Sequence, residues 1–150
     1  MTFIDMYDES PVLRHRDVTV GRRREEMVRS LLAAVDGGDV GAVAASFSPD
    51  ARQRFGNRPW MYGRPEIEAA YVAFASTVDG MRNEVTGIWE SAGTVIVRLE
   101  FHCERLDGSV VEVPAVCMFS EGPDGLIDVF QIWSDWTPLF ATVPWAATRP

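Results

Sequence analysis

The sequence predicts an α+β fold in which N-terminal helices cover one face of a curved, mainly antiparallel sheet. Two observations predict it. Apolar residues recur at helical spacing as far as Gly80, and the runs after it alternate apolar with polar residues between turn signals. Helices first and an antiparallel meander after them are typical of an α+β domain.

The first helix is expected over Arg22–Val35, because Met27, Leu31 and Val35 recur every four residues. The two glycines after this helix supply a C-cap, and Asp39 is expected to cap the next one. That second helix is short and is predicted over Val40–Phe47.

The third helix is expected to begin at Pro65, a residue favoured in the first helical turn, and to end at Asp79-Gly80. Strands are expected at Ala51–Gly56, Met81–Glu90, Thr94–Arg105, Val110–Ser120 and Leu126–Trp136. An Asp-Gly turn separates the third and fourth of these strands, so they form a hairpin.

Length and composition bound the function. A chain of 150 residues holds one sizeable core, predicted as a domain over 21–140 between an N-terminal arm (1–20) and a tail (141–150). The net charge of −8 argues against a nucleic-acid partner. No apolar run suits a bilayer and the N-terminus does not resemble a signal peptide, so a cytoplasmic location without a membrane partner is expected.

Residues with metal-binding side chains are few. Cys103 and Cys117 are the only cysteines and His15 and His102 the only histidines, and none is arranged in a HExxH or CxxC motif. We therefore expect no metal and no cofactor. Cys117 is expected to be a small buried apolar residue rather than a nucleophile.

The strand Thr94–Arg105 organises the rest of the chain. Its alternation places two rows of side chains on opposite faces: Val95, Val97, Leu99 and Phe101 on one, and Ile96, Arg98, Glu100 and His102 on the other. The apolar row needs a core behind it. The polar row either faces water as a structural ion pair or lines a pocket, and the sequence alone leaves both alternatives open.

Several short motifs, in their order, resemble the nuclear transport factor 2-like superfamily. They are Leu31-Leu-Ala-Ala-Val-Asp-Gly-Gly-Asp-Val, Ser48-Pro-Asp-Ala, Gly63-Arg-Pro-Glu-Ile, Val113-Pro-Ala-Val-Cys-Met-Phe, Leu126-Ile and Trp133-Ser-Asp-Trp. Within the superfamily the chain is most similar to SnoaL-like polyketide cyclases, ketosteroid isomerase and limonene epoxide hydrolase. The resemblance covers about residues 22–140 and implies a cone-shaped, cystatin-like fold with a strongly curved sheet, an apolar pocket and a homodimer.

With this fold, strand parity predicts which side chains face the pocket and bind a hydrophobic small molecule. The polar row Ile96, Arg98, Glu100 and His102 is placed inside. Val113, Ala115, Cys117, Phe130, Ile132 and Ser134 join it from the following strands, and Leu31, Leu32, Val35, Phe55, Trp60 and Tyr71 close the pocket.

The chain departs from the acid–base residues of each relative. The three ketosteroid isomerase positions fall on Phe55, Leu31 and Cys117, and the acid of the SnoaL-like cyclases also falls on Cys117. The Arg-x-Asp of limonene epoxide hydrolase is matched by Arg98-x-Glu100. Its other positions fall on Ile132, Gln53 and Phe55, so only part of that machinery is present.

Two hypotheses follow. In the first, a cofactor-free enzyme moves protons on a terpenoid, steroid or polyketide, as an epoxide hydrolase, isomerase, dehydratase or cyclase. Glu100 is then the acid or base, Arg98 orients it, and His102 is an auxiliary donor. In the second, the same cone is a non-catalytic module for ligand binding or assembly, which the incomplete catalytic sets favour.

Overall fold

The computed structural model describes residues 20–141, so the expected arm up to residue 19 and the tail from residue 142 lie outside the described residues. The helices are α1 (Arg22–Asp36), α2 (Val40–Ala45), α3 (Arg64–Ala75) and α4 (Thr137–Phe140). The strands are β1 (Phe47–Phe55), β2 (Met61–Tyr62), β3 (Val78–Ser91), β4 (Thr94–Arg105), β5 (Val110–Glu121) and β6 (Ile127–Ser134).

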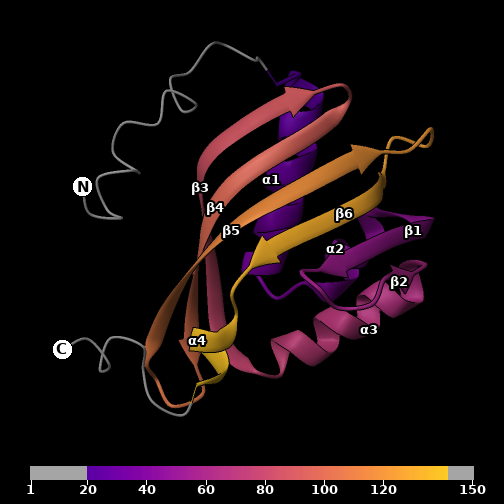
Figure 1. Ribbon diagram of the computed structural model, residues 1–150. Helices are drawn as coiled ribbons and strands as arrows, with labels where there is room; N and C mark the ends of the chain where they lie inside the picture. The colour runs from indigo at the N-terminus through magenta and orange to yellow at the C-terminus, as the bar shows by residue number, and fades with distance from the viewer. Residues whose placement is uncertain (1–19, 142–150) are drawn as a thin grey trace, which may run out of the picture.

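One six-stranded sheet has the order β2-β1-β6-β5-β4-β3, and only the β1–β6 pair is parallel. The long strands bend strongly, and α1, α2 and α3 lie on the concave side (Figure 1). The predicted α+β fold with a strongly curved, mainly antiparallel sheet is confirmed. No helix within 20–141 is long and apolar enough to cross a membrane.

Most element boundaries agree with the sequence pattern. The predicted strand Thr94–Arg105 is β4, and the side chain of Asp39 accepts a hydrogen bond from the Ala42 amide at 3.0 Å, capping α2 as expected. The helix predicted to run to Phe47 stops at Ala45 instead. Phe47 already pairs with Ile127 in the sheet.

Two turn signals lie inside strands. Ser48-Pro49-Asp50 belongs to β1, where the pairing register with β6 shifts between Phe47 and Arg52. A proline without an N–H group is tolerated at such an irregularity. Asp79-Gly80 likewise lies in β3, at a register shift between Val78 and Gly80. Each register shift thus accommodates, within a strand, residues that are typical of turns.

The core lies between the concave face and the helices. Val97 pairs with Cys117 and Leu99 with Ala115 across β4 and β5, and all four side chains are at most 5% exposed. Further along the same face, Phe119 stacks on the ring of Phe130 with 4.4 Å between centroids. The apolar row of β4 is therefore the inner one, and its polar row faces outward.

Candidate functional site

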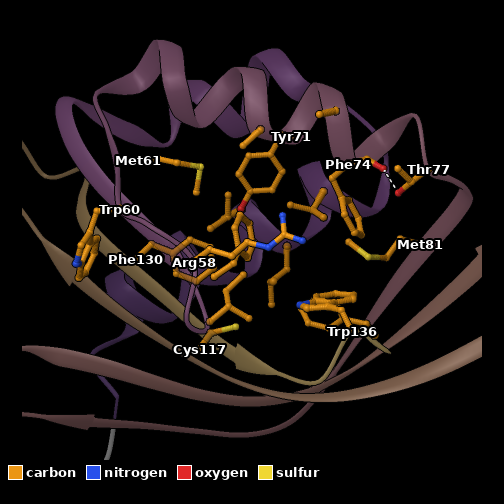
Figure 2. A pocket seen from close by; sticks show the side chains of 18 of the residues that line it. Arg58, Trp60, Met61, Tyr71, Phe74, Thr77, Met81, Cys117, Phe130 and Trp136 are labelled. Carbon is orange, nitrogen blue, oxygen red and sulfur yellow. Dashed lines mark hydrogen bonds between the residues drawn. The ribbon is translucent and has the colours of Figure 1, made fainter. Parts of the chain in front are cut away.

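A cavity of about 580 Å³ lies between the concave face and helices α1 and α3. Figure 2 shows aromatic and aliphatic side chains surrounding it, with Cys117 on the side of the sheet and Tyr71 on the side of the helices. It is lined by Leu31, Leu32, Val35, Phe55, Arg58, Pro59, Trp60, Met61, Ala70, Tyr71, Ala73, Phe74, Thr77, Met81, Phe101, Cys117, Phe130, Ile132, Trp136 and Phe140.

Most apolar residues predicted for the pocket do line it: Leu31, Leu32, Val35, Phe55, Trp60, Tyr71, Cys117, Phe130 and Ile132. The prediction is wrong for Val113, Ala115 and Ser134, which lie outside the lining. Val113 and Ala115 face inward but are 0% and 5% exposed, because side chains fill the core at that end of β5. Helix α4, which was not predicted, packs against β5 and contributes the buried Leu139.

The prediction that Arg98, Glu100 and His102 face the cavity is wrong, and so is that for Ile96. Directly paired residues of neighbouring strands share one face of the sheet. Cys117 lines the cavity and pairs with Val97, so Arg98, the next residue on β4, points to the convex face. The same register takes Glu100 and His102 to that outer face, where they pair with Pro114 and Glu112 of β5.

On the convex face these side chains contact residues other than those expected. Arg98 donates from Nε to the Thr86 hydroxyl at 3.0 Å and from Nη2 to the Thr86 carbonyl at 3.1 Å, rather than to Glu100. His102 lies between two carboxylates, with Nε2 3.3 Å from Glu84 and Nδ1 3.3 Å from Glu112. The polar row is thus a surface network on the far side of the sheet from the cavity.

Tyr71 and Gln53 supply the polar pair beside the cavity. Gln53 of β1 is 0% exposed, and its Nε2 donates to the Tyr71 hydroxyl oxygen at 3.3 Å. Its Oε1 is buried without a hydrogen-bond partner among residues 20–141. Figure 2 shows the hydroxyl of Tyr71 pointing into the pocket. The hydroxyl oxygen therefore accepts from Gln53, while its proton is available to a molecule in the cavity.

Burial governs the protonation of Tyr71 and Cys117, two ionisable groups in the lining. It raises the pKa of the Tyr71 phenol well above its ordinary value, so the phenol stays a donor. It also raises the pKa of the Cys117 thiol, which agrees with the expectation that Cys117 is a buried apolar residue and not a nucleophile.

Sequence reasoning missed several residues of the wall. Phe74 and Trp136 meet edge to face at 5.4 Å between centroids, and Trp136 also lies 4.9 Å from the ring of Phe101. Phe74 follows Ala70 and Tyr71 at helical spacing, but the residues predicted to close the pocket did not include it. Arg58 is the one charged residue among the described residues of the lining. It lies in the irregular segment between β1 and β2, where no periodicity in the sequence indicates which way a side chain points.

A model of the SnoaL-like domain family matches residues 28–130. The chain belongs to the SnoaL-like domain family. This family lies within the nuclear transport factor 2-like superfamily, in agreement with the resemblance found in the motifs. No match was found among curated proteins.

Solved structures share the fold of this SnoaL-like domain at low sequence identity. A hypothetical protein from Catenulispora acidiphila DSM 44928 with a ketosteroid isomerase-like fold, in complex with trimethylamine, has a TM-score of 0.71 at 16% identity, covering 83% of this chain and 98% of its own. The epoxide hydrolase/cyclase-like enzyme SalBIII has a TM-score of 0.69 at 20% identity, covering 77% and 93%. A protein from Jannaschia sp. CCS1, provisionally assigned as a SnoaL-like polyketide cyclase, has a TM-score of 0.72 at 15% identity, covering 91% and 99%.

Proposed function

We propose that this SnoaL-like domain binds a hydrophobic small molecule that carries an oxygen atom, and that Tyr71 donates a hydrogen bond to that oxygen. The observation that carries the proposal is the combination of an apolar cavity of about 580 Å³ with one fixed hydroxyl donor inside it. Small-molecule sites are typically apolar, with a few placed polar groups that orient the ligand. The structural neighbour in complex with trimethylamine supports a small-molecule site in this fold.

The hydroxyl of Tyr71 is held in place before any ligand arrives. Its oxygen accepts from Gln53, and its ring meets Phe55 edge to face at 6.3 Å between centroids. A ligand oxygen that replaces water at this donor keeps the hydrogen bond, whereas a purely hydrocarbon ligand leaves the hydroxyl unpaired. The proposed preference is therefore for a carbonyl, ether, epoxide or hydroxyl over the corresponding hydrocarbon.

A binding experiment with two matched naphthalenes tests the proposal. In isothermal titration calorimetry, 2-acetylnaphthalene is expected to bind about fivefold more tightly than 2-ethylnaphthalene, the value of one neutral hydrogen bond. Tyr71→Phe should remove that difference, because it removes both the hydrogen bond to the acetyl oxygen and the hydroxyl that 2-ethylnaphthalene leaves unpaired. Equal affinities in the unmodified protein would contradict the role of Tyr71.

The position of the binding site is tested by filling the cavity. Ile132→Trp places a large ring in the cavity and is expected to abolish binding of both naphthalenes, whereas Trp133→Phe changes the neighbouring residue on the convex face and should have no effect. Ala70→Phe is a second filling variant, introduced from α3. Circular dichroism establishes that each variant is folded, and unaltered binding in both folded filling variants would place the ligand elsewhere.

Catalysis on such a ligand is a second candidate, which the fixed donor favours. A hydrogen bond from Tyr71 would stabilise negative charge that develops on an epoxide or carbonyl oxygen during reaction. The similarity to SalBIII, an epoxide hydrolase/cyclase-like enzyme, makes epoxide opening the first reaction to test. With limonene 1,2-epoxide, Tyr71→Phe should lower turnover at least tenfold while Glu100→Gln leaves it unchanged; absence of turnover would leave the binding function alone.

The homodimer and the cytoplasmic location expected from the sequence stay predictions. The convex face carries the cross-strand pair Val116 and Trp133, which are 39% and 42% exposed. If this pair lies in a dimer interface, light scattering should give the mass of two chains, and Trp133→Glu should give the mass of one.

A further inference from the structure

The mouth of the cavity carries arginines that the proposed function does not use. Arg58 belongs to the lining, and Arg52 and Arg54 lie beside it on the outward face of β1. Their guanidinium carbons are 5.1 and 5.8 Å from the ring centroid of Trp60, which lines the cavity as well. Arg58 in the lining and the two arginines beside Trp60 thus place three positive charges on neighbouring segments, in a protein whose net charge is −8.

These arginines differ from those of helix α1. Arg22, Arg23, Arg24 and Arg29 of α1 all form ion pairs with glutamates. Among residues 20–141, by contrast, no carboxylate lies within 4.0 Å of the guanidinium group of Arg52, Arg54 or Arg58. The mouth therefore presents positive charge that the described residues do not neutralise.

The backbone around Arg58 is held in place. Its amide donates to the Phe55 carbonyl at 2.9 Å, and its carbonyl accepts from Nε of Arg54 at 3.1 Å. Gly56, whose φ of +50° favours glycine, donates from its amide to the Ile132 carbonyl at 2.7 Å and so ties the turn to β6. Figure 2 shows the side chain of Arg58 extending across the pocket rather than away from it.

We infer that the ligand of this cavity is an amphipathic organic anion, with an apolar body in the pocket and a carboxylate on Arg58. The inference rests on the proposed binding function and adds the charge of the ligand. A guanidinium group binds a carboxylate with two parallel hydrogen bonds, and such charge-assisted bonds are stronger than neutral ones. Arg52 and Arg54 add to the positive potential that draws an anion to the mouth.

A pair of isosteric ligands that differ in charge tests the inference. At pH 7.5 and 20 mM NaCl, 2-naphthylacetate is expected to bind five- to tenfold more tightly than the neutral 2-naphthylacetamide. Arg58→Gln should remove this preference without changing the affinity for the amide. Arg29→Gln, which removes the same charge from an ion pair on α1, is the matched control and should keep the preference.

Salt provides a second readout. Raising NaCl to 0.5 M should reduce the affinity for the acetate and leave that for the amide unchanged, since exposed charges are screened within a few ångströms at this ionic strength. Equal affinities for the two ligands in the unmodified protein, or a preference that survives in Arg58→Gln, overturns the anion inference and leaves the proposed function standing. If the unmodified protein binds neither ligand more tightly than the filled variant Ile132→Trp does, the proposed binding function itself fails.

Discussion

Alternation along β4 places apolar side chains on one face of the sheet and polar side chains on the other, and the two faces have different surroundings. On the concave face Val97 and Leu99 are 0% exposed, and Phe101 of the same row lines an apolar cavity. On the convex face Arg98 and His102 contact exposed residues of β3 and β5. A row of Arg, Glu and His on a strand is therefore a poor marker of a site by itself. What makes the concave face a candidate site is its enclosure by helices and the volume that the side chains leave empty.

Truncation of neighbouring residues on β4 should separate the two faces most clearly. Leu99→Ala is expected to lower the free energy of unfolding by about 3 kcal/mol, because it removes buried atoms and leaves a void. Glu100→Ala, one residue further on the convex face, should change it by less than about 0.5 kcal/mol. Urea denaturation followed by circular dichroism measures both, and similar losses would contradict the assignment of faces.

The polar pair on the concave side should be the next most sensitive feature. Tyr71→Phe removes the acceptor of the Gln53 amide and leaves that buried group unpaired, which is expected to cost about 1–2 kcal/mol in urea denaturation. The double variant Tyr71→Phe with Gln53→Met removes both polar partners and should recover part of the loss. Strictly additive effects of the two substitutions would show that the pair is not coupled.

Alkaline pH should lower the free energy of unfolding through Cys103, a buried thiol in the apolar row of β4. Burial raises the pKa of this thiol from its ordinary value of 9.0 to about 11, so the folded state retains a proton that the unfolded state releases. The stabilisation is present below pH 9 and is lost as the pH rises from 9 to 11. Between pH 8 and pH 10 the free energy of unfolding should fall by about 1 kcal/mol more than in Cys103→Val. Equal pH dependence in the two proteins would contradict the shift.

The smallest effect is expected on the convex network. His102→Gln breaks contacts with Glu84 and Glu112 that are open to solvent on the carboxylate side. Such partly exposed pairs contribute less than about 1 kcal/mol, and naphthalene binding should be unchanged because the cavity lies on the other face. A loss of naphthalene binding in His102→Gln, measured by calorimetry, would show that residues of the convex face contribute to the binding site.

Local pattern was sufficient for much of the fold. Strict alternation predicted β4 from Thr94 to Arg105, and Asp39 was correctly expected to cap α2. Helical spacing also put Tyr71 and Leu32 among the apolar residues of their helices, and both line the cavity. These features depend on neighbours within a few residues, so the sequence by itself determines them.

Tertiary structure decided which row of β4 faces the helices and where the cavity lies. Alternation places Leu99 and Glu100 on opposite faces of β4 but does not say which face packs against the helices. The apolar row faces the helices because burying apolar side chains is favourable and burying charged ones is costly. The contact between Gln53 and Tyr71 joins a strand to a helix, and Arg58 reaches the pocket from an irregular turn. The cavity is the volume that side chains from distant segments leave unfilled, and no local pattern encodes it.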